Sequence, residues 1–233
     1  MPLPSVTLIR QFDTHRLVPS RHLPGGASVL GAIADDDEHL LAIIELDGAT
    51  NDRLLGEQRL LPGIGPEELV FGVPCADVIN ATFCHPNPLG GRFNGPDRGA
   101  WYGAFDIDTA QAEVGFHKSV QLAEIGRFED SVTYDEYLAD FSAAFHDLRK
   151  SRGALRACLN PHSYVEAQAL AERLLAQDSL GVVYPSVRRA GGTCVSCFRP
   201  ALVMNVRRGR RYRFTWKGTS EPTVALEQHS TKN

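Results

Sequence analysis

GGRFNGPDRGAWYGAFDIDTAQAEVGF, from Gly90 to Phe116, is the most informative stretch of this 233-residue chain. It contains an arginine beside two glycines, then an aromatic phenol, then a carboxylate early in a predicted helix: Arg92, Tyr102 and Glu113. Arginine offers a rigid fork of donors that matches phosphate geometry, and tyrosine offers a flat face with one hydroxyl. A glutamate can hold a sugar hydroxyl and stabilise positive charge at an anomeric carbon. The combination suits a dinucleotide whose glycosidic bond is to be broken.

A helix is predicted around Glu113, because Asp108 followed by Gln111 is typical of a helix start. At about 100° per residue, Glu113 lies on the edge of an apolar stripe formed by Ala112, Phe116, Val120 and Ala123. The carboxylate is therefore either at the rim of a wet cleft or an acidic residue favoured by the helix dipole. Glu113 and His117 could also share a metal ion, but no third or fourth ligand is apparent, so we expect no metal.

A second informative run is GVVYPSVRRAGGTCVSCFRP, from Gly181 to Pro200. Ser186 follows a predicted buried strand, and polar residues just past strand ends commonly contact ligands. Ser186 is therefore a candidate for a hydrogen bond to a ligand, or it closes a turn. Without a Gly-x-Ser-x-Gly elbow it is not expected to be a nucleophile. Arg188 is a weaker candidate for a second phosphate contact.

These two runs, in this order, resemble the core of the RES-domain family over about residues 71 to 216. The resemblance implies an α+β fold with a mixed central sheet and flanking helices, similar to the mono-ADP-ribosyltransferase (diphtheria-toxin-like) fold. It also implies that NAD is consumed as a substrate. Glu113 would hold the ribose, Tyr102 would pack on the nicotinamide ring, Arg92 would position the diphosphate, and Ser186 would donate a hydrogen bond.

The chain departs from the family pattern just before this core. Many members carry an arginine followed by an aromatic residue about ten to twenty residues before the GGRF motif. Here the corresponding stretch is Phe83-Cys84-His85, which keeps neither. In diphtheria-toxin-like enzymes a histidine helps to hold the adenosine side of NAD, so His85 is either a site residue or a loop residue.

The family resemblance leaves the acceptor of ADP-ribose open. A protein acceptor makes the chain an ADP-ribosyltransferase, which we favour; water makes it an NAD glycohydrolase, and phosphate an NAD phosphorylase. A catalytically dead, partner-binding module is a further alternative. The implied partner is an antitoxin with an Xre-type helix-turn-helix. Only this antitoxin would bind DNA in the complex. A homodimer within that complex is also conceivable.

Composition excludes several other classes of protein. A formal net charge of −4 argues against a globally basic nucleic-acid binder. No apolar run approaches the roughly 20 residues that span a bilayer, and the first residues do not read as a signal peptide. Five cysteines, an odd number, indicate reduced thiols and a cytoplasmic location. Cys194 and Cys197 would point to opposite faces of a strand and are expected to be packing residues.

The domain organisation is predicted as a partly helical extension, residues 1 to 70, followed by a RES domain, residues 71 to 233. The loop from Pro62 to Pro66 marks the boundary, and the acidic run 35–38 suggests a helix start within the extension. Further helices are expected after Thr133, with Leu138, Phe141, Phe145 and Leu148 on one face, and after Ser163. Strands are expected at Val6 to Phe12, Gly181 to Tyr184, Thr193 to Phe198 and Arg211 to Trp216. The basic run 207–213 is interpreted as an exposed hairpin turn at Gly209.

Overall fold

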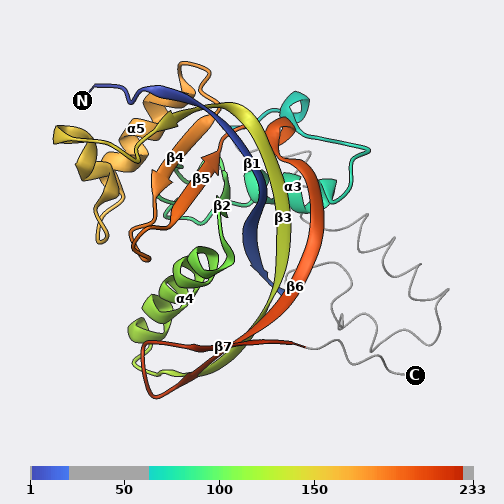
Figure 1. The fold of residues 1–233 in the computed structure, drawn as a ribbon, viewed down its shortest axis with the longest axis vertical. Coiled ribbons are helices and arrows are strands. Elements are labelled where there is room, and N and C mark those ends of the chain that lie inside the picture. Colours follow the sequence, from blue (N-terminus) through green and yellow to red (C-terminus); the bar gives the residue numbers. More distant parts are fainter. Residues whose placement is uncertain (1, 21–62, 228–233) are drawn as a thin grey trace.

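Seven strands form one mixed sheet in the computed structural model, which describes residues 2–20 and 63–227 (Figure 1). The predicted α+β class with a mixed central sheet and flanking helices is confirmed. The strands are β1 (Val6–Pro19), β2 (Trp101–Ala104), β3 (Glu129–Asp147), β4 (Gly181–Pro185), β5 (Thr193–Cys197), β6 (Met204–Lys217) and β7 (Thr223–Leu226). The helices are η3 (Pro66–Glu68), α3 (Ala76–Cys84), α4 (Ile107–Glu124), η4 (Gly153–Leu159), α5 (Val165–Leu175) and η5 (Pro200–Leu202).

The pairing of the strands closes five of them into a ring. The order along the sheet is β1-β2-β5-β4-β3-β6-β7, and β1 also pairs with β3. That second pairing is long, running from Val6 opposite His146 to Pro19 opposite Tyr134. Only β3 and β4 are parallel among the pairs of the described strands. The strands β1, β3 and β6 curve side by side as the long wall of the molecule (Figure 1).

The residues of the sheet pack into two hydrophobic cores on opposite faces. Trp101 belongs to the core beside α3, whereas its neighbour Tyr102 packs against the core beneath α4 and α5. Cys194 and Cys197 divide in the same way, and both are buried. The predicted alternation of β2 and β5 is therefore confirmed, and both cysteines contribute to packing.

The predicted helix after Thr133 is wrong, because these residues belong to the long strand β3. The expected apolar positions Leu138, Phe141 and Phe145 have intervals of three and four, and an interval of four fits period 2 as well as 3.6. Residues 134 to 137 are all buried, since β3 is covered on both faces there, and this hides the alternation. Glu136, which lies in this stretch, accepts a hydrogen bond from the backbone N–H of Arg210 on β6.

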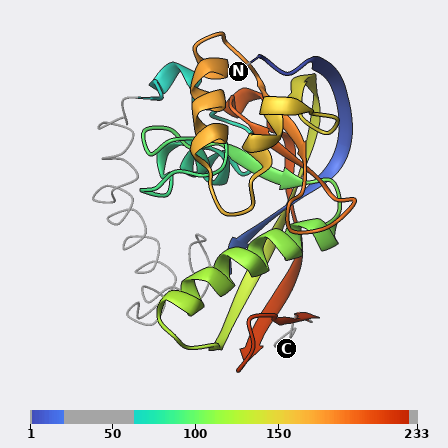
Figure 2. The same ribbon diagram turned by 90° about the vertical axis from the view of Figure 1, so that its left-hand side faces the viewer.

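The helix carrying Glu113 is confirmed as α4, with two corrections. It starts two residues earlier than expected, because the Asp106 side chain accepts a hydrogen bond from the backbone N–H of Thr109 at 2.9 Å. Its buried face is also different, since the predicted apolar stripe turns away from the core, with Val120 40% exposed. The buried positions are Thr109, Ala110, Gly115 and Leu122. Figure 2 shows α4 lying across β3 and β6, where Trp216 Nε1 donates to Ser119 Oγ at 2.9 Å.

Two further element starts differ from expectation. The third predicted helix is α5, which begins at Val165 with Tyr164, not Ser163, in the N-cap position. No turn occurs at Gly209, because β6 continues through it from Met204 to Lys217. A Cβ at Gly209 would collide with the Glu136 carboxylate on the neighbouring strand. The glycine therefore admits that carboxylate into the sheet, and does not reverse the chain.

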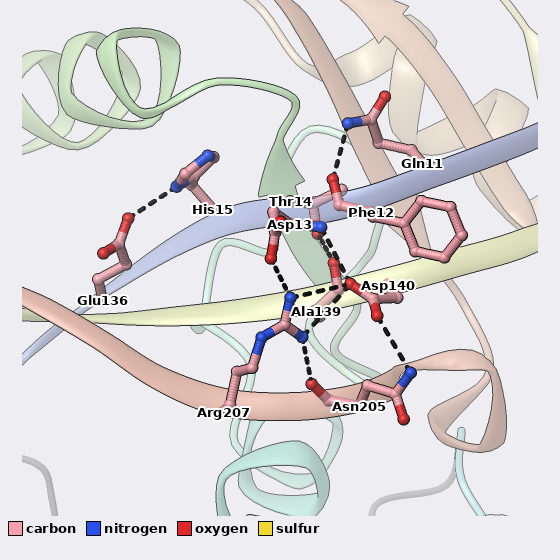
Figure 3. Close-up of polar contacts among 10 residues, drawn as sticks. All are labelled: Gln11, Phe12, Asp13, Thr14, His15, Glu136, Ala139, Asp140, Asn205 and Arg207. Atoms are coloured by element: carbon pink, nitrogen blue, oxygen red, sulfur yellow. Dashed lines mark hydrogen bonds and ion pairs between the residues drawn. The ribbon is translucent and has the colours of Figure 1, made fainter.

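Polar side chains bind the three long strands together where β1, β3 and β6 carry bulges (Figure 3). Asp140 accepts hydrogen bonds from the Asp13 backbone N–H at 2.9 Å and from Asn205 Nδ2 at 3.1 Å. Arg207 forms ion pairs with Asp140 and Asp13. On the same wall, His15 Nδ1 lies 2.7 Å from Glu136 Oε1. Much of the basic run is therefore paired with acidic residues of adjacent strands.

Residues 63 to 68 are fastened to the rest of the protein by an ionic cluster around Arg98. Arg98 is 6% exposed and bonds both carboxylate oxygens of Glu68 at 2.7 Å. Its guanidinium also donates to the carbonyls of Gly63 at 2.7 Å and Phe198 at 2.6 Å. Strand β1 lies within the sheet, and the acidic run 35–38 is outside the described residues. The predicted domain boundary at residue 70 stays a prediction.

No helix within 2–20 and 63–227 is long and apolar enough to span a bilayer.

Candidate functional site

The GGRFN motif forms a tight turn that is built around the hydroxyl of Tyr102. The backbone N–H of Gly91 donates to the Asn94 carbonyl at 3.0 Å. Tyr102 Oη accepts from the Phe93 backbone N–H at 2.8 Å and donates to Asn94 Oδ1 at 2.8 Å. A Cβ at Gly91 would lie 2.5 Å from Asn94 Oδ1 and 2.7 Å from Tyr102 Oη. The second glycine of the motif is therefore required by this close approach.

Tyr102 is a neutral phenol in this setting. Burial raises its pKa to about 12, outweighing the backbone hydrogen bond from Phe93 that lowers it. The hydroxyl is thus engaged both as a donor and as an acceptor within the turn. What Tyr102 has left to offer a ligand is the face of its ring.

Arg92 is held almost fully inside the protein, with 6% of its surface exposed. Its Nη1 donates to the carbonyls of Asn160 at 2.8 Å and Cys158 at 3.2 Å. The guanidinium carbon lies 4.5 Å from the centre of the Tyr164 ring, in cation–π contact. Its Nη2 is buried without a hydrogen-bond partner. A buried donor of this kind is unfavourable until an acceptor reaches it.

Glu113 is oriented by the turn that follows β4. Ser186 Oγ donates to Glu113 Oε1 at 2.6 Å and accepts from the backbone N–H groups of Arg188 and Arg189 at 3.1 and 3.0 Å. Cys194 Sγ on β5 also donates to Glu113 Oε1, at 3.9 Å. Burial, followed by the nearby Glu113 carboxylate, raises the pKa of the Cys194 thiol, so it remains a protonated donor. Two neighbouring strand ends thus fix one carboxylate.

Arg188 closes over the same region from the turn after β4. Its guanidinium carbon lies 3.4 Å from the centre of the Phe116 ring on α4, and its Nη2 donates to the Pro161 carbonyl at 2.6 Å. Its Nε is buried without a partner. The next residue, Arg189, pairs with Asp108 at 3.1 Å and so ties the turn to the start of α4. Arg92 and Arg188 both donate hydrogen bonds to backbone carbonyl groups of residues 158 to 161.

The structure brings together five of the six predicted site residues: Arg92, Tyr102, Glu113, Ser186 and Arg188. Two residues that neighbour several of the five show this. The pKa of His117 is affected by the charges of Glu113, Arg92 and Arg188. The pKa of Tyr184 is affected by the charges of Glu113, Arg92 and Tyr102. His85 is placed elsewhere, at the C-cap of α3. It lines a separate cavity of about 150 Å³ with Phe71, Asp77 and Asn80, and no described contact joins it to the five.

Two further residues, Tyr164 and His117, belong to the site although the sequence did not assign them to it. Tyr164, beneath the Arg92 guanidinium, comes from the segment before α5, which no motif marks. His117 lies one helical turn beyond Glu113, and its ring centre is 6.5 Å from that of Tyr164. Its spacing from Glu113 suggested a shared metal, but no group of three or more potential ligands occurs among the described residues. Both residues are recognised only from the fold.

A groove of about 780 Å³ runs along the outer face of α4. It is lined by the apolar positions that sequence analysis assigned to a core-facing stripe, including Ala112, Phe116 and Val120. Pro222 and Val224 form its opposite wall. Arg188 and Phe116 border both the groove and the cluster around Glu113, so one stacked pair separates the two.

A comparison with known proteins finds a match over the part of the chain that contains this site. The family model described as "RES domain" matches residues 70–217. Among solved structures, the chain is similar to the crystal structure of the M. tuberculosis MbcT–MbcA toxin–antitoxin complex, at 17% identity and a TM-score of 0.40. That match covers 58% of this chain and 75% of the other, and it is too slight to argue from. No curated protein matches the sequence.

Proposed function

The chain belongs to the RES-domain family, and on that premise we propose that it is an enzyme that consumes NAD by breaking the bond between nicotinamide and ribose. The observation that carries the proposal is the placement of the Glu113 carboxylate, fixed by Ser186, near the buried Arg92 guanidinium with its unpartnered Nη2. A carboxylate beside an anion-binding arginine suits a substrate that combines a ribosyl centre with a diphosphate.

In the proposed reaction the C–N bond to nicotinamide breaks and its electron pair leaves with the nicotinamide ring. The ribosyl centre becomes oxocarbenium-like, and Glu113 hydrogen-bonds the ribose and stabilises the positive charge. Ser186 and Cys194 hold that carboxylate in place, so little reorganisation is needed when charge develops. No metal is required for any of these steps.

The remaining roles follow from which atoms are still available. Tyr102 supports the nicotinamide with its ring, because its hydroxyl is engaged by Phe93 and Asn94. Arg92 positions the diphosphate through Nη2, and Arg188 contributes a second cationic contact. The Ser186 hydroxyl donates its hydrogen bond to Glu113 in this structure. Ser186 would therefore have to share this hydrogen between Glu113 and the dinucleotide in order to contact the dinucleotide. His85 has no part in this arrangement.

We further propose that the acceptor of ADP-ribose is a protein side chain, with water or phosphate as the alternative acceptors. Membership of the RES family supports a toxin whose cleft is covered by an antitoxin, and the family resemblance implies that this antitoxin has an Xre-type helix-turn-helix. DNA contact would then belong to the antitoxin, consistent with the net charge of −4 here. A cytoplasmic location and a homodimer within that complex are part of the same proposal.

The test is nicotinamide release from NAD by the purified protein, freed of any antitoxin, with and without phosphate. Glu113→Gln is compared with Glu124→Gln, a matched control that exposes its carboxylate farther along the same helix. We expect Glu113→Gln to lower the rate by about 100-fold or more and Glu124→Gln to leave it unchanged. Phosphate dependence identifies phosphorolysis. Protein without activity is then given labelled NAD in a cell lysate, and an unlabelled lysate excludes the enzyme and leaves a binding module.

A further inference from the structure

His117 occupies a position in the site that the proposed roles leave unused. It lies four residues after Glu113 on α4, and side chains at this spacing share a face of a helix, with Cβ atoms about 5–6 Å apart. Its ring makes edge contacts with Phe116 and Tyr164, at centre-to-centre distances of 5.6 and 6.5 Å. These two rings are the ones on which Arg188 and Arg92 stack. His117 therefore lies beside both arginine–aromatic pairs, and it is an exposed residue.

The surroundings of His117 favour a neutral ring with a free lone pair. Partial burial lowers its pKa below the usual 6.5, and the charges of Arg188 and Arg92 lower it further, whereas only Glu113 raises it. The residue is nevertheless exposed to solvent. A neutral, accessible imidazole beside the carboxylate that holds the ribose is suited to accept a proton at neutral pH.

We propose that His117 is the general base for the acceptor of ADP-ribose, and that the acceptor therefore attacks through an O–H group. This inference rests on the proposed NAD cleavage and adds the acceptor half of the reaction. As nicotinamide leaves with its bonding electron pair, the acceptor oxygen forms a bond to the anomeric carbon. The proton of that oxygen passes to the unprotonated nitrogen of His117. The acceptor class includes water and the hydroxyl groups of protein side chains.

The experiment compares wild type, His117→Gln and His146→Gln in nicotinamide release with the acceptor that supports activity, in the presence and absence of azide. His146, near the end of β3, is a matched control, because burial also lowers its pKa and its ring bonds Ser179 outside the site. Azide is an anion with no proton to give up, so its attack needs no base. We expect His117→Gln to lose at least about tenfold in rate at pH 7.5, and azide to restore most of it as ADP-ribosyl azide.

The pH profile of the wild type gives a second readout that needs no variant. We expect the rate to fall as the pH drops through a value below 6.5, and this acidic limb to be absent in azide. A His117→Gln rate equal to the wild type, or a loss that azide fails to restore in a variant with an unchanged melting curve, would overturn the role of His117. An inactive wild type would instead remove the proposed function, and this inference with it.

Discussion

The hydroxyl of Ser186 joins the candidate catalytic carboxylate to the backbone of its own turn. It donates to Glu113 Oε1 at 2.6 Å while accepting from the N–H groups of Arg188 and Arg189. The hydroxyl cannot leave Glu113 without also changing the partners of these amides. The position of the carboxylate and the shape of the turn are therefore linked through one atom.

Ser186→Ala is expected to lower kcat about tenfold with little change in KM, because Glu113 loses a charge-assisted hydrogen bond of about 1.5 kcal/mol. The free energy of unfolding should fall by about 1 kcal/mol, since two backbone amides lose their acceptor. Steady-state kinetics and chemical denaturation measure both quantities, with Ser142→Ala on the exposed face of β3 as control. A rise in KM with kcat unchanged would show instead that Ser186 acts on the substrate.

Tyr102→Phe removes the hydroxyl but keeps the ring face. The Phe93 N–H and Asn94 Oδ1 then lose their partner, so we expect unfolding to become easier by about 1–3 kcal/mol. NAD affinity should change by less than about threefold in a variant that remains folded, whereas Tyr102→Ala should weaken it strongly. Calorimetric titration with NAD separates the two. Equal loss of affinity in both variants would mean that the hydroxyl contacts the ligand.

Glu68 should make the stability of the protein depend on pH in the acid range. Hydrogen bonding from Arg98, the largest cause, lowers its pKa from 4.5 to about 2. Because the folded-state pKa is the lower one, its contribution is complete above pH 4.5 and is lost as pH falls toward 2. We expect wild type to exceed Glu68→Gln by about 3 kcal/mol at pH 6 and the gap to close near pH 2. Glu67→Gln, which alters an exposed carboxylate, serves as control; a gap independent of pH would contradict this account.

The five thiols should separate by accessibility. Cys158, Cys194 and Cys197 are buried, and burial raises their pKa, to about 12 for Cys197. Cys75 and Cys84 are partly exposed. At pH 7.5 a maleimide should therefore modify Cys75 and Cys84 in the native protein and all five only after unfolding, as read by mass spectrometry. Rapid modification of Cys194 would show that solvent reaches the back of Glu113.

Much of the site was predictable because its residues lie in two short runs of sequence. Arg92, Tyr102 and Glu113 sit within the first run and Ser186 and Arg188 within the second, and the fold brings the two runs together. Tyr164 and His117 were not predictable as members, since their importance comes from the rings and charges that surround them in space. The role of every one of these residues in catalysis stays a prediction.

The fold was less predictable where a pattern is compatible with two periods or where burial is two-sided. The spacing of Phe141 and Phe145 predicts a helix for the first reason, and the burial of residues 134 to 137 conceals the alternation of the strand for the second. Gly209 predicts a turn because glycine usually marks one, whereas here a glutamate of the adjacent strand requires the space. The closure of the sheet by β1 depends on pairings between distant segments, which local patterns do not report.

The closed ring of strands sets a limit on how early the protein can mature during synthesis. Asp13 on β1 and its partner Asp140 on β3 are 127 residues apart, and β1 has only a single pairing with any strand other than β3. The ribosome makes β1 well before β3, so β1 has to wait unpaired while the residues between them are synthesised. Folding should accordingly be slow, and the site should gain its final form only after these distant strands have paired.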